Sequence, residues 1–127
     1  EAVIFAERLR KWLVKHNASL LEKSKTHPAK VLMESEIYLR RVRGLEESKA
    51  LTARMSKLQI NRDIRILVAA YKKFDALVKY ERTRGASRST EASKKRLAAT
   101  LESYVLKKDL DKAVLDEAKQ LLSQVKK

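Results

Sequence analysis

The sequence predicts an all-α protein, a compact bundle of five or six helices forming one domain over residues 1–127. Apolar residues recur three and four positions apart, and no segment shows the alternation of a strand. The 127 residues include only two glycines and one proline, too few for a turn-rich β protein. Apolar residues make up 44% of the chain, so a chain of this length can bury a substantial core.

The first segment has the apolar spacing of a helix that packs on a core and ends near His16 and Asn17. Its stripe consists of Ala2, Phe5, Leu9, Trp12 and Leu13. Ser19 and Glu22 then have the spacing of a capping box, in which serine and glutamate bond each other's backbone amides. This spacing fits either the start of a second helix or an unused motif within one continuous helix. We favour a break or kink of the helix at this point.

Pro28 marks the start of the next helix, because proline suits the first helical turn, with Thr26 or His27 as the cap. The stripe of this helix consists of Val31, Ser35, Tyr38 and Val42. We expect it to stop at Gly44, since glycine best accepts the left-handed turn after a helix. A short helix follows, with Leu51, Met55 and Leu58 on one face.

The strongest predicted helix begins at Asn61 or Asp63 and ends near Arg84 and Gly85. Its stripe has Ile64, Leu67, Tyr71, Phe74 and Val78, widened by Ile66, Ala70 and Leu77. So wide a stripe predicts a central helix buried on two sides. Residues 85–90 form a polar loop, with Ser89 or Thr90 as the next cap.

Two further helices complete the predicted bundle. The first carries Leu97, Leu101, Tyr104 and Val105. The second covers about residues 110–126, can be capped by Asp109 or Asp111, and has a stripe of Leu110, Val114, Ala118, Leu121 and Val125.

The charge of the chain indicates an anionic partner. There are 30 Lys and Arg residues against 16 Asp and Glu residues, a net charge of +14. The basic excess lies entirely within residues 1–108, whereas the last helix is neutral. Such an excess over one small domain favours binding to the phosphate backbone of DNA or RNA.

Two basic clusters are the candidate nucleic-acid-binding residues. The first comprises Lys79, Tyr80, Arg82, Arg84, Arg88, Lys94, Lys95 and Arg96. Cations near a helix N-terminus are mildly unfavourable, so a phosphate bound by loop amides and the helix start explains several of them better than structure does. Tyr80 lies off the apolar stripe and could stack on a base. The competing interpretation is a solvated basic loop.

The second cluster is Arg40, Arg41 and Arg43, at the end of a predicted helix. Cations interact favourably with a helix C-terminus, so a structural role is the stronger interpretation of this cluster.

Catalytic and metal-binding patterns are lacking in the sequence. There is no cysteine, so thiolate nucleophiles and cysteine metal sites are excluded. Two glycines cannot form a phosphate-binding glycine-rich loop. His16 and His27 have no paired ligand spacing, and we expect capping or surface roles for both. We therefore expect no enzyme activity, no metal and no cofactor. The chain begins at Glu1 without an initiator methionine, which indicates a fragment or a processed chain.

Part of the chain resembles the helical N-terminal domain of the transcription elongation factor TFIIS. The resemblance runs from Leu39 through the segment 51–58 to Lys72, Lys73 and Phe74. Phe74 stands where that family has a tryptophan, and the glycine of the family's central helix is missing. The resemblance covers less than half of the chain, and we do not assign the chain to the family. It implies a role as a protein-interaction hub in transcription.

The sequence is compatible with three functions. The leading hypothesis is a non-catalytic domain that binds the phosphate backbone, as a nucleic-acid-binding subunit of a larger assembly. The alternative is a protein–protein interaction bundle that uses an apolar groove on the central helix. A third is adhesion to an anionic membrane surface through Phe5, Trp12 and the cations of the first helix. We disfavour this third hypothesis, because the spacing predicts a helix that faces the core.

Overall fold

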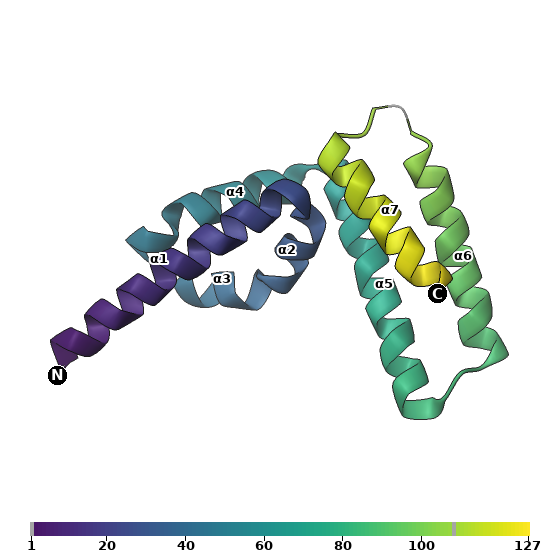
Figure 1. The fold of residues 1–127 in the computed structure, drawn as a ribbon, viewed down its shortest axis with the longest axis horizontal. Helices are drawn as coiled ribbons and strands as arrows, with labels where there is room; N and C mark the ends of the chain where they lie inside the picture. Colours follow the sequence, from purple (N-terminus) through teal and green to yellow (C-terminus); the bar gives the residue numbers. More distant parts are fainter. Residues whose placement is uncertain (1, 108) are drawn as a thin grey trace.

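The computed structural model describes residues 2–107 and 109–127, and all of their regular structure is helical (Figure 1). The all-α prediction is confirmed, but the predicted count of helices is slightly low. The described residues form α1 (Ala2–Thr26), α2 (Pro28–Glu34), α3 (Glu36–Val42), the 3-10 turn η1 (Glu46–Ser48), α4 (Lys49–Ile60), α5 (Arg62–Arg84), α6 (Arg88–Val105) and α7 (Lys112–Lys126).

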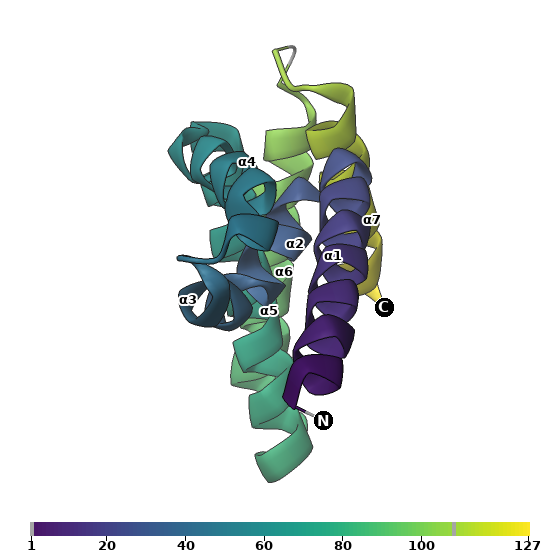
Figure 2. The same ribbon diagram turned by 90° about the vertical axis from the view of Figure 1, so that its left-hand side faces the viewer.

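The helices fall into two groups that share one core. Helices α1 to α4 form the first group, and α5, α6 and α7 form the second (Figure 1). Figure 2 shows α2 between α1 and α4, and α2 also contacts α5 and α7. The most deeply buried apolar side chains come from both groups and pack in one cluster that includes Ala29, Leu51, Leu67, Leu101 and Ala118.

Helix α1 differs from its prediction in two ways. It runs unbroken through His16 to Ser19, so the expected break is wrong and the capping-box spacing is unused. Its first half also extends beyond the other helices (Figure 1), where Phe5 and Trp12 are 69% and 52% exposed. The expectation that this stripe faces the core is therefore wrong for residues before Leu13. Helical spacing identifies an apolar face but cannot say whether another element covers it.

The helix predicted from Pro28 to Gly44 is divided at Ser35. The Ser35 hydroxyl donates a 2.6 Å hydrogen bond to the carbonyl of Val31 and lies 3.7 Å from the sulfur of Met55. A serine that bonds back to the preceding turn bends a helix, which accounts for the division into α2 and α3. The predicted stripe is nevertheless on the inner side, since Val31, Ser35 and Val42 are buried.

The two glycines differ in backbone conformation. Gly85, which ends α5, has a φ of 81°, whereas Gly44 has no positive φ. The predicted end of α5 is thus confirmed, and the left-handed turn at Gly44 is wrong.

The helix caps were predicted in part. The Asn61 side chain accepts hydrogen bonds from the amides of Asp63 and Ile64, as expected for the start of α5. Helix α6 is capped by Ser87, with Thr90 as the third residue of a reciprocal capping box, so neither Ser89 nor Thr90 is the cap. Asp111 occupies the cap position of α7 without a side-chain cap bond.

The predicted stripes of the last three helices are largely buried. In α5, Ile64, Leu67 and Tyr71 are buried, whereas Phe74 and Val78 are only half-buried. In α6 and α7 the buried apolar side chains are Leu97, Leu101, Tyr104, Val114, Ala118, Leu121 and Val125. The central position of α5 is confirmed for its first half, and its second half extends toward the turn that leads into α6.

Candidate nucleic-acid interface

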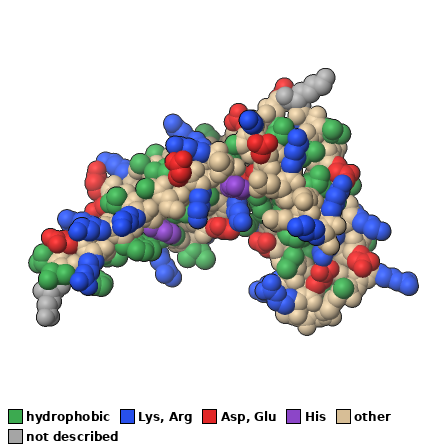
Figure 3. All heavy atoms as spheres, viewed as in Figure 1, with side chains coloured by type: hydrophobic (Ala, Val, Ile, Leu, Met, Phe, Trp, Pro, Cys, Tyr) green, Lys and Arg blue, Asp and Glu red, His purple; other side chains and the backbone are tan. Residues whose placement is uncertain are grey.

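The first basic cluster lies around the turn between α5 and α6. Residues 79–84 end α5 and residues 88–96 begin α6, so the helical hairpin brings both segments to one end (Figure 1). Within this cluster the exposed cations are Lys79, Arg82, Arg84, Arg88, Lys95 and Arg96. Figure 3 shows Lys and Arg side chains projecting at this end of the molecule.

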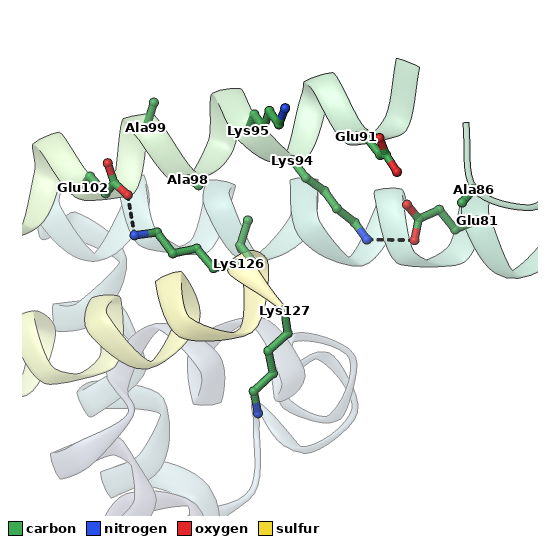
Figure 4. Close-up of a pocket in the computed structure, with 11 residues that line it drawn as sticks. Glu81, Ala86, Glu91, Lys94, Lys95, Ala98, Ala99, Glu102, Lys126 and Lys127 are labelled. Carbon is green, nitrogen blue, oxygen red and sulfur yellow. Dashed lines mark hydrogen bonds and ion pairs between the residues drawn. The ribbon is translucent and has the colours of Figure 1, made fainter. Parts of the chain in front are cut away.

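Lys94 differs from the rest of the cluster, because it has a partner within the chain. Its ammonium donates a 2.8 Å hydrogen bond to Glu81 Oε2, and the two side chains are only 26% and 21% exposed. This hydrogen bond is the main reason that the pKa of Glu81 is lowered. The ion pair joins α6 to α5 (Figure 4), so Lys94 has the structural role that the sequence did not indicate.

The aromatic candidate Tyr80 is paired with a member of the same cluster. Its ring is partly exposed, and the Arg84 guanidinium lies over it at 5.5 Å from the ring centroid. This cation–π contact holds a cation of the cluster against the ring.

The start of α6 offers fewer amides to a phosphate than the sequence suggested. The Ser87 hydroxyl accepts a hydrogen bond from the Thr90 amide at 3.2 Å. In return, the Thr90 hydroxyl accepts one from the Ser87 amide at 3.0 Å. Because these two amides are already bonded, phosphate contacts at this turn depend mainly on the basic side chains.

A pocket of about 550 Å³ lies beside the first cluster, between α5, α6 and the end of α7 (Figure 4). Its charged lining residues are Glu81, Glu91, Lys94, Lys95, Glu102, Lys126 and Lys127. Besides the Glu81–Lys94 pair, Lys126 contacts Glu102 at 2.5 Å. Because Lys94 and Lys126 are already in ion pairs, they are not available to bind a small anion in the pocket. Lys95 points away from Lys94, on the outer side of α6 (Figure 4).

The second basic cluster lies on the other group of helices. Arg40 pairs with Glu36 one turn earlier in α3 at 3.2 Å, and Arg41 and Arg43 are exposed. Helix α3 ends at Val42, so these arginines sit at its negative end, as the structural interpretation requires. Figure 1 places α3 well away from the α5–α6 turn, and the structure does not join the two clusters into one surface.

A groove on the central helix is also present, between α5 and α6. It has a volume of about 460 Å³ and is lined by Ile66, Ala69, Ala70, Lys73, Leu97, Thr100, Leu101, Ser103, Tyr104 and Lys107. Tyr104 is fixed at its wall by a 2.7 Å hydrogen bond from its hydroxyl to the carbonyl of Asp63. Burial raises the pKa of Tyr104 to about 12, so this hydroxyl stays protonated as a donor at neutral pH.

Both histidines make structural contacts. His16 stacks on Trp12 with ring centroids 4.8 Å apart, and its ring also meets the edge of Tyr38. His27 Nε2 lies 2.8 Å from the side-chain oxygen of Gln120 in α7. Across residues 2–107 and 109–127, no group of three His, Asp or Glu side chains is placed to hold a metal ion.

One exposed surface, the apolar first half of α1, was expected from the sequence to face the core. The run from Ala2 to Ala6 contains five apolar residues in succession, more than one face of a helix can hold. That run is the signal that could have revealed it. In the part of the chain that the structure describes, no helix is long and apolar enough to cross a membrane.

Comparisons with protein-family models, curated proteins and solved structures give no match to this chain.

Proposed function

We propose that this chain is a non-catalytic, nucleic-acid-binding helical domain that contacts the phosphate backbone through the α5–α6 turn. The observation that carries the proposal is the set of exposed cations at that turn, in a chain with a net charge of +14. Phosphate contacts require side chains that can reach an external anion, and six arginines and lysines around Gly85 have this exposure: Lys79, Arg82, Arg84, Arg88, Lys95 and Arg96.

The geometry supports contact with a backbone rather than with bases. The basic side chains lie on both sides of the turn between two helices, and a sequence with only two glycines has no glycine-rich loop to bind a phosphate or a base. The Tyr80 ring with Arg84 over it is a single stacking platform. A domain of this kind binds many sequences with similar affinity, and its affinity falls steeply with salt.

The test measures affinity for single- and double-stranded DNA and RNA by fluorescence anisotropy over a salt series. The variant is Arg84→Gln/Arg88→Gln/Lys95→Gln, which spares Lys94 because its removal would leave Glu81 without its partner. The matched control is Lys57→Gln/Lys112→Gln/Lys119→Gln, which removes the same charge from exposed positions elsewhere.

We expect the α5–α6 variant to bind more weakly than the control and to show a shallower salt dependence. On duplex DNA, log affinity falls by about 0.9 per neutralised phosphate for each unit of log salt, so each lost contact reduces the slope by about that amount. Equal effects of the two variants would show that only total charge matters. Absence of binding at low salt would overturn the proposal.

A second candidate function is protein–protein interaction through the groove between α5 and α6. The observation that favours it is the apolar wall formed by Ile66, Leu97 and Leu101, with Lys73 and Lys107 among the lining residues. Such a groove suits an amphipathic helix that carries acidic residues at its edge. Ala69→Gln would obstruct this groove without touching the α5–α6 turn and without changing the net charge. Nucleic-acid binding that is unchanged in Ala69→Gln would show that the groove is not part of the nucleic-acid contact.

A further inference from the structure

The first half of α1 carries a row of large apolar side chains that stay exposed in the fold. Phe5, Leu9 and Trp12 are 69%, 46% and 52% exposed, although Leu13, the next residue of the helix, is buried. Figure 3 shows hydrophobic side chains gathered at the end of α1 that extends past the other helices. Adjoining apolar side chains that remain exposed mark a surface that binds a partner.

The spacing of this row is that of a coiled-coil seam. Positions 2, 5, 9, 12 and 16 are alternately three and four residues apart, as are the a and d positions of successive heptads. Successive helical residues point about 100° apart, so Phe5, Leu9 and Trp12 lie within an arc of about 60°. So narrow a stripe fits the contact between two helices, whereas a helix that lies on a broad apolar surface buries a face of at least about 100°.

The inner end of the seam is already ordered. The Trp12 ring stacks on His16 with ring centroids 4.8 Å apart, and it meets the Tyr38 ring of α3 nearly at right angles at 6.1 Å. The Tyr38 hydroxyl in turn donates a 2.5 Å hydrogen bond to Asn17 Oδ1. Because α1 is a helix and Trp12 is held before any partner arrives, binding does not bear the entropic cost of ordering them.

Cations occupy one flank of the seam. Arg8 and Lys15 take the g positions of the two heptads, which lie beside the seam and form ion pairs with a partner helix. Both side chains are exposed, and neither has an ion-pair partner within residues 2–107 and 109–127. Glu7 is the only carboxylate among residues 7–15. The groups that complement this flank are therefore carboxylates.

A second copy of α1 does not supply these carboxylates. In a parallel pair each g position faces an e position of the other helix, and the e positions here hold Ala6 and Leu13. In an antiparallel pair the g positions face each other, which brings the cations together. Nucleic acid would complement the cations through its phosphates, but phosphate contacts leave an apolar row uncovered.

We propose that the seam of α1 binds an amphipathic helix of a partner protein, with apolar residues at its own a and d positions and Asp or Glu beside them. The partner helix lies along α1 on the side of α3, and Trp12 is its anchor, since tryptophan is prominent among the residues that dominate binding energy. This surface belongs to the group of helices α1 to α4. The inference therefore does not rest on nucleic-acid binding at the α5–α6 turn.

The test follows the fluorescence of Trp12, which is the only tryptophan in the chain and lies within the seam. The probes are three synthetic heptad peptides of equal length without tryptophan. The first has leucine at a and d and glutamate at e and g. The second has lysine in place of glutamate, and the third has serine in place of leucine. Repulsion between its glutamates keeps the first peptide from pairing with itself.

We expect the leucine–glutamate peptide to shift the emission of Trp12 to the blue in a saturable titration. The other two peptides should leave the emission unchanged at the same concentrations. Phe5→Ser/Leu9→Ser should abolish the shift. Its matched control, Ile60→Ser/Leu106→Ser, changes two side chains that are 79% exposed elsewhere and should retain the shift.

Reversal of the flanking charge tests the choice of partner. Arg8→Glu/Lys15→Glu should weaken binding of the leucine–glutamate peptide by about tenfold and should allow the leucine–lysine peptide to bind. A purely structural role of these cations would not exchange the preference between the two peptides. Ala69→Gln, which obstructs the groove between α5 and α6, should leave the shift of Trp12 unchanged.

Several results would overturn the proposal. Absence of a shift with the leucine–glutamate peptide would exclude the acidic helix, and an equal shift with the serine peptide would mean attraction by charge alone. A blue shift with phosphatidylserine vesicles but not with the peptide would assign the row to a bilayer. Self-association in analytical ultracentrifugation that Phe5→Ser/Leu9→Ser abolishes would assign it to a second copy. Circular dichroism verifies that each variant keeps its helices, and the comparison of peptides on the wild type needs no variant.

Discussion

Glu117 provides a sharp test of how the two groups of helices are held together. Its side chain is fully buried in α7, where its two carboxylate oxygens accept hydrogen bonds from the amides of Ala29 at 3.1 Å and Lys30 at 2.7 Å. These amides begin α2, whose cap residue His27 makes no side-chain cap bond. A carboxylate from a distant helix therefore caps α2, and the Tyr71 hydroxyl, whose pKa is raised by burial and by this carboxylate, lies beside it.

Replacing Glu117 with alanine leaves those two amides without an acceptor. An unsatisfied buried donor costs about 1–3 kcal/mol, and Ala29 is completely buried whereas Lys30 is exposed to water. Removing the carboxylate also removes its own desolvation cost, which offsets part of the loss. We expect Glu117→Ala to lower the free energy of unfolding by about 2–4 kcal/mol. Glu117→Gln retains one acceptor oxygen and should cost less.

The same residue predicts a dependence of stability on pH. Burial raises the pKa of Glu117 above its ordinary value of 4.5 and outweighs the two backbone hydrogen bonds, which act in the opposite direction. In the window between 4.5 and the raised value, the folded state therefore holds a proton that the unfolded state has released. The free energy of unfolding of the wild type, relative to Glu117→Gln, must fall as the pH rises through that window.

The assay is urea unfolding followed by far-ultraviolet circular dichroism, for the wild type, Glu117→Ala and Glu117→Gln at several pH values from 4 to 8. Asp116→Asn, an exposed carboxylate on the same helix, is the control and should stay within about 0.5 kcal/mol of the wild type. A decrease of less than about 0.5 kcal/mol in the free energy of unfolding of Glu117→Ala would show that Glu117 does not cap α2. If the free energy of unfolding of the wild type, relative to Glu117→Gln, rises with pH, burial does not raise the pKa of Glu117.

Three further predictions concern contacts between helices. Lys94→Met should return the pKa of Glu81 toward its ordinary value, as measured by NMR titration of the carboxyl group. The loss of stability caused by Lys94→Met should fade as the pH falls, because Glu81 then becomes protonated in both proteins. An unchanged pKa of Glu81 would contradict the pairing. Leu67→Ala should lower the free energy of unfolding, measured by urea unfolding, by about 2–5 kcal/mol. Phe74→Ala should lower it clearly less, because the Phe74 side chain is only half-buried. Equal losses of stability would mean that both side chains are equally buried. Asn17→Ala should lower the free energy of unfolding by about 1–3 kcal/mol in the same assay, because the Asn17 side chain makes hydrogen bonds to both η1 and α3. An unchanged free energy of unfolding would mean that water replaces these hydrogen bonds.

Local sequence patterns predicted the parts of the fold that depend on neighbouring residues. The helical class follows from apolar spacing, and the buried stripes of α6 and α7 were located from that spacing alone. The start of α5 at Asn61 was predicted because its side chain reaches amides only two and three residues away. The end of α5 at Gly85 is equally local, since its positive φ suits glycine.

The tertiary structure decided which faces are covered and which polar groups are paired. The break at Ser35 and the continuity of α1 at Ser19 could not be separated by spacing, because both serines occur in helical patterns. Lys94 belongs to a basic run in the sequence, yet it alone of that run lies against Glu81 of the preceding helix. Exposure of the other cations of the run leaves the candidate interface as a prediction that binding must test.

The sequence by itself therefore determined the helical class, the cap at Asn61 and the basic excess, because these depend on residues within one or two turns or on composition. Only the tertiary structure decided that the tip of α1 is exposed, that Glu117 caps α2 and that Lys94 is paired. Each of these depends on where a helix distant in the chain packs, and neither the spacing of apolar residues nor the count of charges carries that information.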